Sequence, residues 1–229
     1  MTPVQVGRAF FGVDLTPAKI RRREERRQVI LDVATDLFSA KGYHGTSMRD
    51  LGDALGLYPG SLYAHIRSKE DVLYAIVDHV SELYEDQLRA VLESGLPPLD
   101  QLRELTRRHL CVGMEHLRAA TVCAHEWKYL GARRRALIGA RRDQYEAGLR
   151  SIVAACIADG TFRPLDVPLA SIAILGVLNW TYVWYRPHGR LRPPELAHCL
   201  VEFLIDGFSP RPATRPAAAT VVLPPTLAG

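Results

Sequence analysis

Residues 46–70 read TSMRDLGDALGLYPGSLYAHIRSKE, and this string predicts two short helices joined by a tight turn. Ser47 with Asp50 three residues later matches a capping box, although Asp is a weaker partner than Glu there. Gly56 ends the helix that follows. A second short helix is expected over residues 59–65, and Ser68 caps another helix that continues to about residue 93.

A longer helix is expected immediately before this string. Thr16 and Pro17 form a helix start, with a hydroxyl at the N-cap and proline at the first helical position, and Gly42 ends the helix. Apolar residues recur along it with helical spacing: Val29, Ile30, Val33, Ala34, Leu37 and Phe38. Three helices with a tight turn between the second and third predict a helix-turn-helix, whose short third helix fits the DNA major groove.

Downstream of Pro97 and Pro98 the chain has the pattern of long helices over residues 98–112, 114–130, 132–159, 166–186 and 193–208. No segment shows the two-residue period of a strand. We therefore expect an all-α fold. The divisions are a flexible arm over 1–18, a three-helix DNA-binding domain over 19–83, a larger helical domain over 84–208, and a disordered tail over 209–229.

Composition is compatible with this interpretation but does not establish it. The 229 residues are 48% apolar, carry a net charge of +4 and include four cysteines with no Cys-x-x-Cys pair. The N-terminus lacks the layout of a secretory signal, so we expect a cytoplasmic protein with reduced thiols. The stretch 169–185 is apolar enough to suggest a membrane span. It is short for that role and contains Asn179 and Thr181, so a core or dimer helix is the preferred interpretation.

The chain resembles the tetracycline-repressor (TetR) family over about residues 23–83. The family pattern Phe-x-x-x-Gly-aromatic-x-x-Thr-Ser is matched from Phe38 to Ser47, and Gly-x-Leu-Tyr-x-His-Phe-x-x-Lys-Glu is matched from Gly60 to Glu70. Ile66 stands where the family usually has Phe. The resemblance implies a homodimeric transcription repressor that binds double-stranded DNA at a palindromic operator, with half-sites roughly 34–36 Å apart or a multiple of that.

The resemblance also implies which residues contact DNA. At the start of the recognition helix, base edges or nearby phosphates are contacted by Tyr58, Gly60 and Ser61. Phosphate contacts are expected from the groove side of that helix, from the start of the second helix and from the start of the fourth: Tyr63, His65, Thr46, Ser47, Arg49 and Lys69. Leu51, Leu55, Leu62 and Ile66 are expected in the core instead. The arginine-rich stretch 21–27 either reaches the DNA backbone or forms a solvated helix face paired through Glu24 and Glu25.

In relatives the last two helices pack against their copies as a four-helix bundle. The candidate dimer residues in this chain are Leu175, Leu178, Tyr182, Leu200, Phe203 and Leu204. The resemblance is weaker in this half of the chain, because the C-terminal half varies across the family.

Residues 179–189 and the segment His125-Glu126-Trp127, followed by arginines in 133–142, resemble a subgroup that senses acyl-CoA thioesters. The small-molecule inducer is then an acyl-CoA or another apolar compound. Candidate pocket residues are Met114, Trp127, Tyr129, Trp180 and Trp184, with Arg134, Arg141 and Arg142 meeting phosphates. Plain core packing of the aromatics, and an exposed arginine face, remain alternatives. A regulator with a non-CoA ligand and a DNA-binding protein with no ligand also remain open.

Enzyme signatures are lacking. His125 and Glu126 do not complete a zinc-protease motif, because position 129 is Tyr, and no Gly-rich phosphate loop or Gly-x-Ser-x-Gly string occurs. We expect no enzyme activity, no cofactor and no metal site. The mechanism inferred is a shift of the helix over 98–112 and of the fourth helix, which changes the spacing of the two recognition helices when the inducer binds.

Overall fold

The structure is a computed structural model, and it describes residues 17–209. The predicted arm over 1–18 and tail over 209–229 lie outside the described residues, except at their inner ends. Helices make up the described part of the chain, which contains no strand and so confirms the all-α prediction. The elements are α1 (Pro17–Lys41), α2 (Met48–Leu55), α3 (Pro59–Tyr63), α4 (Lys69–Leu92), α5 (Pro98–Glu115), α6 (Leu117–Glu126), the short 3₁₀ helix η1 (Trp127–Tyr129), α7 (Ala132–Ala158), α8 (Val167–Trp184) and α9 (Pro193–Phe208).

The ends of α1 and α2 lie where the local signals placed them. The Ser47 hydroxyl accepts from the Asp50 N–H at 3.1 Å and the Asp50 carboxylate accepts from the Ser47 N–H at 2.7 Å, which is a complete capping box. Gly42 and Gly56 have φ angles of 76° and 63° and follow α1 and α2 in the left-handed conformation that glycine tolerates.

One helix boundary differs from the prediction. The break between α5 and α6 lies at His116 (φ −110°, ψ 38°), not at Gly113, and the predicted helix over 114–130 is divided into α6 and η1. Gly113 stays within α5, where an added Cβ would lie 3.2 Å from the Tyr84 hydroxyl. Glycine at this position therefore reflects the space needed by a neighbouring side chain rather than the end of a helix.

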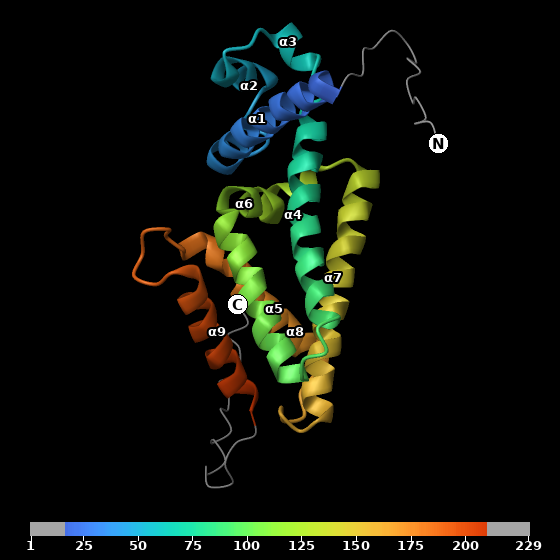
Figure 1. Ribbon diagram of the computed structural model, residues 1–229, viewed down its shortest axis with the longest axis vertical. Coiled ribbons are helices and arrows are strands. Elements are labelled where there is room, and N and C mark those ends of the chain that lie inside the picture. Colours follow the sequence, from blue (N-terminus) through green and yellow to red (C-terminus); the bar gives the residue numbers. More distant parts are fainter. Residues whose placement is uncertain (1–16, 210–229) are drawn as a thin grey trace, which may run out of the picture.

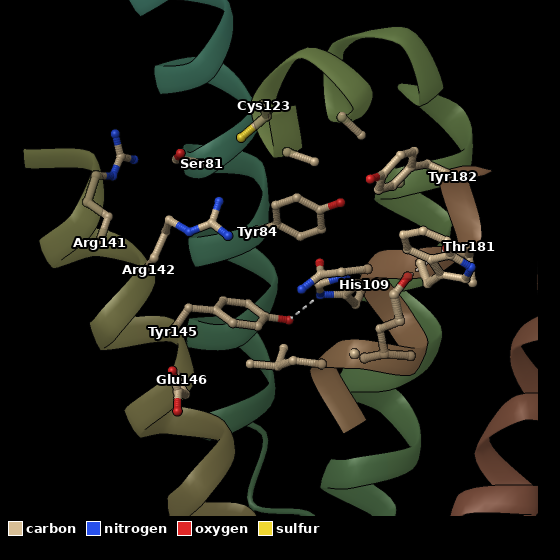
Figure 2. A pocket seen from close by; sticks show the side chains of 18 of the residues that line it. Ser81, Tyr84, His109, Cys123, Arg141, Arg142, Tyr145, Glu146, Thr181 and Tyr182 are labelled. Carbon is tan, nitrogen blue, oxygen red and sulfur yellow. Dashed lines mark hydrogen bonds between the residues drawn. The ribbon is translucent and has the colours of Figure 1, made fainter. Parts of the chain in front are cut away.

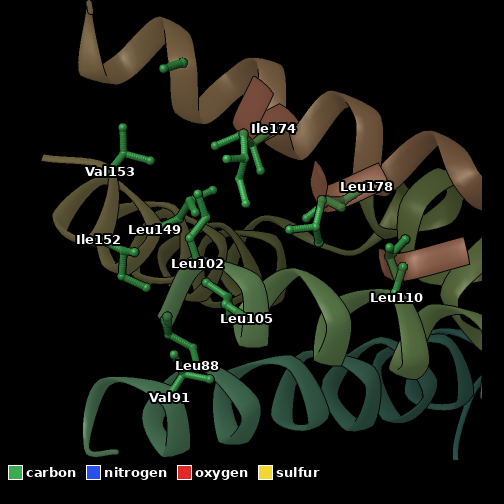
Figure 3. Close-up of a cluster of buried hydrophobic side chains, with 14 of the residues drawn as sticks. Leu88, Val91, Leu102, Leu105, Leu110, Leu149, Ile152, Val153, Ile174 and Leu178 are labelled. Carbon is green, nitrogen blue, oxygen red and sulfur yellow. The ribbon is translucent and has the colours of Figure 1, made fainter. Parts of the chain in front are cut away.

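The helices enclose two apolar cores, and α4 contributes to both. Helices α1 to α3 gather at one end of the molecule, and α4 runs from them into the remaining helices (Figure 1). Val72, Ile76 and Val80 of α4 belong to the first core. About two and three turns farther along, Leu88 and Val91 belong to the second core, which includes Leu105 of α5 and parts of α7, α8 and α9 (Figure 3). A displacement of α4 would thus reach both cores, since packed interiors transmit strain.

Candidate functional site

The helix-turn-helix presents one face of α3 to solvent. Leu62 and Ile66 of this segment are buried, as is Leu51 of α2, and Leu55 is half-buried, so the expected core residues lie where predicted. Four of the predicted DNA contacts, which are Tyr58, Gly60, Ser61 and Tyr63, are exposed, and 88% of the Tyr58 surface is accessible. His65 is half-buried at the end of the segment, and its buried Nδ1 has no hydrogen-bond partner among residues 17–209.

The residues at the start of α2 differ in exposure. Ser47 and Arg49 are exposed, and Arg49 pairs with Asp53 at 3.8 Å. The prediction for Thr46 is corrected, because its side chain is 1% exposed and its hydroxyl donates to the Gly42 carbonyl at 3.0 Å. A side chain enclosed in this way holds the α1–α2 loop together and cannot reach a phosphate.

Lys69, predicted to contact a phosphate, also forms hydrogen bonds within the fold. Its ammonium donates to the carbonyl oxygens of Tyr43 and Thr46, both at 2.8 Å, and lies 4.2 Å from the centre of the Tyr43 ring. Burial lowers the pKa of Lys69. The first residue of α4 is thereby tied to the loop that precedes α2.

The arginine-rich stretch of α1 fits both predictions, contact with the DNA backbone and a solvated, internally paired helix face. Arg21 pairs with Glu25 at 3.6 Å on an exposed helix face, while Arg26 and Arg27 are also exposed. An exposed pair of this kind contributes little to stability.

A cavity of about 410 Å³ lies between α4, α5, α6, α7 and α8 (Figure 2). Its lining has polar and aromatic members from each helix: Ser81, Tyr84, Glu85, His109, Cys123, Arg141, Arg142, Tyr145, Glu146, Asn179, Trp180, Thr181 and Tyr182, besides smaller residues and Leu175 and Leu178. This volume lies in the range of small-molecule sites. The cavity is therefore the candidate ligand site.

A hydrogen-bonded aromatic cluster forms one wall of the cavity. The Nδ1 of His109 lies 2.9 Å from the hydroxyl of Tyr145, and the Tyr84 ring stacks on the imidazole at 4.5 Å between centroids. Burial lowers the pKa of His109 to about 4, offset in part by a hydrogen bond to Asn179. His109 is neutral near pH 7, and this wall offers polar groups without a net charge.

Two arginines of α7 reach the cavity and differ in how far they are already paired. Arg141 forms ion pairs with Asp78 and Glu85, both at 2.5 Å, so its charge is balanced by α4. Arg142 is exposed and forms no ion pair within the described part of the chain. Its guanidinium lies 5.0 Å from the Trp127 ring centre. Arg142 is consequently the cation that a bound anion would meet with less competition.

Several predicted ligand residues lie elsewhere. Of the eight, Arg141, Arg142 and Trp180 line the cavity. Arg134 pairs with Glu70 and Asp71, and Tyr129 stacks on Tyr43 and meets His44 edge-on. Both therefore join the C-terminal helices to the helix-turn-helix. The remaining three are outside the lining for other reasons: Met114 packs in the second core, Trp127 against the first core, and Trp184 is largely exposed.

Most of the predicted dimer residues are buried or half-buried within their own subunit. Leu178 is only 3% exposed, and Leu175, Leu200 and Leu204 pack half-buried against their own core. Tyr182 and both α8 leucines line the cavity instead. Of the six, Phe203 alone is broadly accessible, at 72%.

An exposed apolar face runs along α8 on the side of the helix opposite the predicted dimer residues. It consists of large side chains at helical spacing: Leu169, Ile172, Val177, Trp180, Val183 and Trp184. By length and composition alone α8 could cross a membrane, with 28% of its residues buried, but a single such helix is weak evidence. Phe203 on α9 extends the set of accessible apolar side chains. Large apolar patches of this kind mark contact surfaces.

The residues that sequence reasoning missed are Tyr84, His109, Tyr145 and Asn179. Tyr145 follows Arg142 by three positions and Arg141 by four on α7, so a helical projection could have placed it beside these arginines. His109 and Tyr84 carried no such signal, because their contacts join helices that are distant in the chain.

Comparison with known proteins agrees with this geometry. Residues 30–76 match the family model for bacterial regulatory proteins of the tetR family, and residues 95–208 match that for the tetracyclin repressor-like C-terminal domain. The HTH-type transcriptional repressor KstR2 of Rhodococcus jostii (strain RHA1) is 31% identical over 192 residues, which cover 80% of this chain and 91% of that protein.

Solved structures share the fold. The ketosteroid transcriptional regulator KstR2 of Mycobacterium tuberculosis aligns with a TM-score of 0.78 at 26% identity, covering 81% of this chain and 96% of that one. AibR, in complex with isovaleryl coenzyme A and operator DNA, aligns with a TM-score of 0.72 at 31% identity, covering 79% and 98%. The chain belongs to the TetR family of helix-turn-helix transcription regulators.

Proposed function

We propose that this protein is a homodimeric, cytoplasmic transcription repressor that releases a palindromic operator when an acyl-CoA thioester enters the cavity. Residues 19–83 serve as the DNA-binding domain, and residues 84–208 serve as the ligand-binding and dimerisation domain. The exposed positions of the helix-turn-helix, Tyr58, Gly60, Ser61, Tyr63, Ser47 and Arg49, contact the DNA.

The observation that carries the proposal is the path of α4. Its first residue, Lys69, holds the carbonyls of the α1–α2 loop, while three turns later Ser81, Tyr84 and Glu85 line the cavity. A ligand that favours another position of α4 therefore also changes the position of the recognition helix. A coupling free energy of about 1–3 kcal/mol would change operator affinity roughly 5- to 150-fold.

An acyl-CoA is supported as the effector by two features. The AibR neighbour binds isovaleryl coenzyme A, and the cavity combines aromatic and aliphatic walls with Arg142 at its α7 side. An apolar chain suits the walls, and a phosphate suits an unpaired guanidinium.

A second copy of the chain suits the exposed face of α8. The face carries Ile172, Val177 and Trp180, and Phe203 of α9 adds a fourth accessible apolar side chain. Burial of such side chains contributes about 1.5–3 kcal/mol each, so pairing with a second subunit would be favourable. A dimer also presents two recognition helices to the two halves of a palindrome.

The test is fluorescence anisotropy with a labelled palindromic duplex that the purified protein itself selects from random sequence. Isovaleryl-CoA and longer acyl-CoAs are expected to weaken binding by roughly 5- to 150-fold, whereas free CoA and free fatty acids are not. Arg142→Ala should blunt this response, while Arg133→Ala, on the same helix but outside the cavity lining, should not. Operator binding that no thioester changes would exclude this effector class and leave an inducer of other chemistry.

A further inference from the structure

We infer that Tyr84 selects the effector by donating a hydrogen bond from its hydroxyl to a neutral oxygen of the bound thioester. The inference rests on the proposed effector class and deepens it. The recognised oxygen is either the thioester carbonyl or a hydroxyl or keto group on the acyl chain, and both offer the same acceptor chemistry.

The first step of the argument is an account of the hydroxyl groups that line the cavity. There are five, and four are already used. Ser81 and Thr181 donate to the carbonyls of Val77 and Leu178, at 2.8 and 2.7 Å. Tyr145 and Tyr182 are hydrogen-bonded to His109 and His125, at 2.9 and 2.6 Å.

Tyr84 is the fifth, and its hydroxyl forms no hydrogen bond with any of the residues that the structure describes. Burial raises the pKa of Tyr84, so the phenol keeps its proton at neutral pH and can donate it. The hydroxyl faces the cavity and is therefore free to donate to an acceptor on a bound ligand.

The ring is held in place by its surroundings. Tyr84 stacks on His109 at 4.5 Å and lies at 71° to the Tyr145 ring, at 6.0 Å. Figure 2 shows the ring projecting from α4 between the α7 and α5 sides of the cavity, while Tyr145 points its hydroxyl at His109. The donor position is thus preorganised, which limits the entropy lost when a ligand binds.

Gly113 leaves space in front of the hydroxyl. A Cβ at this position would lie 3.2 Å from the Tyr84 oxygen, so a larger residue would crowd the place where an acceptor must approach. The neighbouring His109 is unsuited to the same role, because its Nδ1 is bonded to Tyr145 and its ring stacks on that of Tyr84.

The position of Tyr84 also connects recognition with release. The residue belongs to α4, the helix whose first residue anchors the loop before α2. A hydrogen bond to Tyr84 acts directly on the element that supports the helix-turn-helix. A ligand that fills the cavity without this bond would contact α4 through apolar packing alone.

The experiment measures binding of three CoA derivatives of equal chain length by isothermal titration, with wild-type protein and Tyr84→Phe. S-hexyl-CoA lacks the carbonyl, hexanoyl-CoA has it, and 3-hydroxyhexanoyl-CoA adds a chain hydroxyl. If Tyr84 donates to the thioester carbonyl, the wild type prefers hexanoyl-CoA to S-hexyl-CoA by about 3- to 10-fold, and Tyr84→Phe abolishes the preference. If Tyr84 donates to the oxygen on the acyl chain, the wild type prefers 3-hydroxyhexanoyl-CoA to hexanoyl-CoA, and Tyr84→Phe abolishes that preference.

Two controls make the result interpretable. Tyr84→Phe should unfold at the wild-type temperature without ligand, because the lost hydroxyl has no protein partner. Tyr74→Phe makes the same chemical change on the same helix outside the cavity lining and should keep wild-type preferences.

The inference is overturned if Tyr84→Phe binds all three compounds with wild-type affinities. A wild-type protein that binds none of them, while still binding its operator, instead overturns the proposed effector class. The two failures are therefore distinguishable.

Discussion

The side-chain carboxylate of Glu126 accepts a 3.0 Å hydrogen bond from the backbone N–H of Tyr43, 83 positions earlier in the chain. The preceding residue, His125, is bonded through Nε2 to Tyr182 in the cavity lining, at 2.6 Å. The end of α6 thus touches the helix-turn-helix with one residue and the cavity with its neighbour, forming a second connection beside α4.

Removal of this carboxylate should loosen the helix-turn-helix. We expect Glu126→Ala to lower the free energy of unfolding by about 1–2 kcal/mol, because the Tyr43 N–H loses a charged acceptor. Glu126→Gln retains an acceptor oxygen and should lose less than half as much. Urea unfolding followed by circular dichroism provides the measurement, and equal midpoints for the alanine variant and the wild type would contradict the expectation.

Loss of an exposed side chain on α3 should affect DNA binding alone. Tyr58→Ala and Tyr63→Ala are each expected to weaken operator binding by about 10-fold, since one good polar or packing contact is worth roughly 1–3 kcal/mol. Both side chains are exposed, so the melting temperature and the dimer should be unchanged. Anisotropy titrations check the affinity, and wild-type operator affinity in both variants would remove these residues from the contact surface.

The helix ends could be predicted because their causes are local. The Ser47–Asp50 capping box and the glycines at 42 and 56 act within a few residues of themselves, and all are present in the structure. The break at His116 could not be placed, because Gly113 resembles a helix end while its reason is the Tyr84 hydroxyl, on another helix.

The face of α8 could not be assigned from periodicity. Apolar residues surround this helix on all sides, so Leu178 and Trp180 are equivalent by composition, although one is buried in its own subunit and the other is 59% exposed. The hydrogen bonds of the polar residues could not be predicted for a related reason. The partners of Thr46 and Lys69 lie across the loop, 4 to 26 positions away, and no spacing rule shows that their side chains are already occupied.

A charge on the exposed apolar surface should separate the subunits. We expect Phe203→Asp to shift the protein toward monomer and to weaken operator binding, because a carboxylate would be buried at the contact of the two copies. Leu137→Asp, at an exposed apolar position on α7, is the matched control. Sedimentation velocity reports the mass, and a variant that remains dimeric at wild-type concentrations would place the interface elsewhere.

Two glycines of α7 should respond in opposite directions to alanine. A Cβ at Gly148 would lie 2.6 Å from a methyl group of Leu88, whereas a Cβ at Gly139 meets nothing within 4 Å. We expect Gly148→Ala to destabilise the fold by about 1–3 kcal/mol through overpacking. Gly139→Ala should stabilise it by up to about 1 kcal/mol through helix propensity. Thermal unfolding checks both, and a Gly148→Ala variant as stable as Gly139→Ala would show that Leu88 moves aside freely.

The buried imidazole of His109 should make stability depend on pH. Its folded-state pKa of about 4 lies below its ordinary value of 6.5, because burial disfavours the charged form. Between these two pKa values the imidazole is protonated in the unfolded chain and neutral in the native protein. Stability is complete above about pH 6.5 and falls as the pH drops toward about 4.

The loss should reach about 2 kcal/mol between about pH 7.5 and about pH 5, a window above the range in which carboxylates titrate. Urea unfolding at several pH values gives the slope. His109→Gln removes the titrating group, so its curve should be flatter than the wild-type curve over this window, whatever its absolute stability. His188→Gln, at an exposed position, is the matched control for the substitution itself. If His109→Gln and the wild type lose stability in parallel, the pH dependence originates in another group and His109 is accessible to protons in the native state.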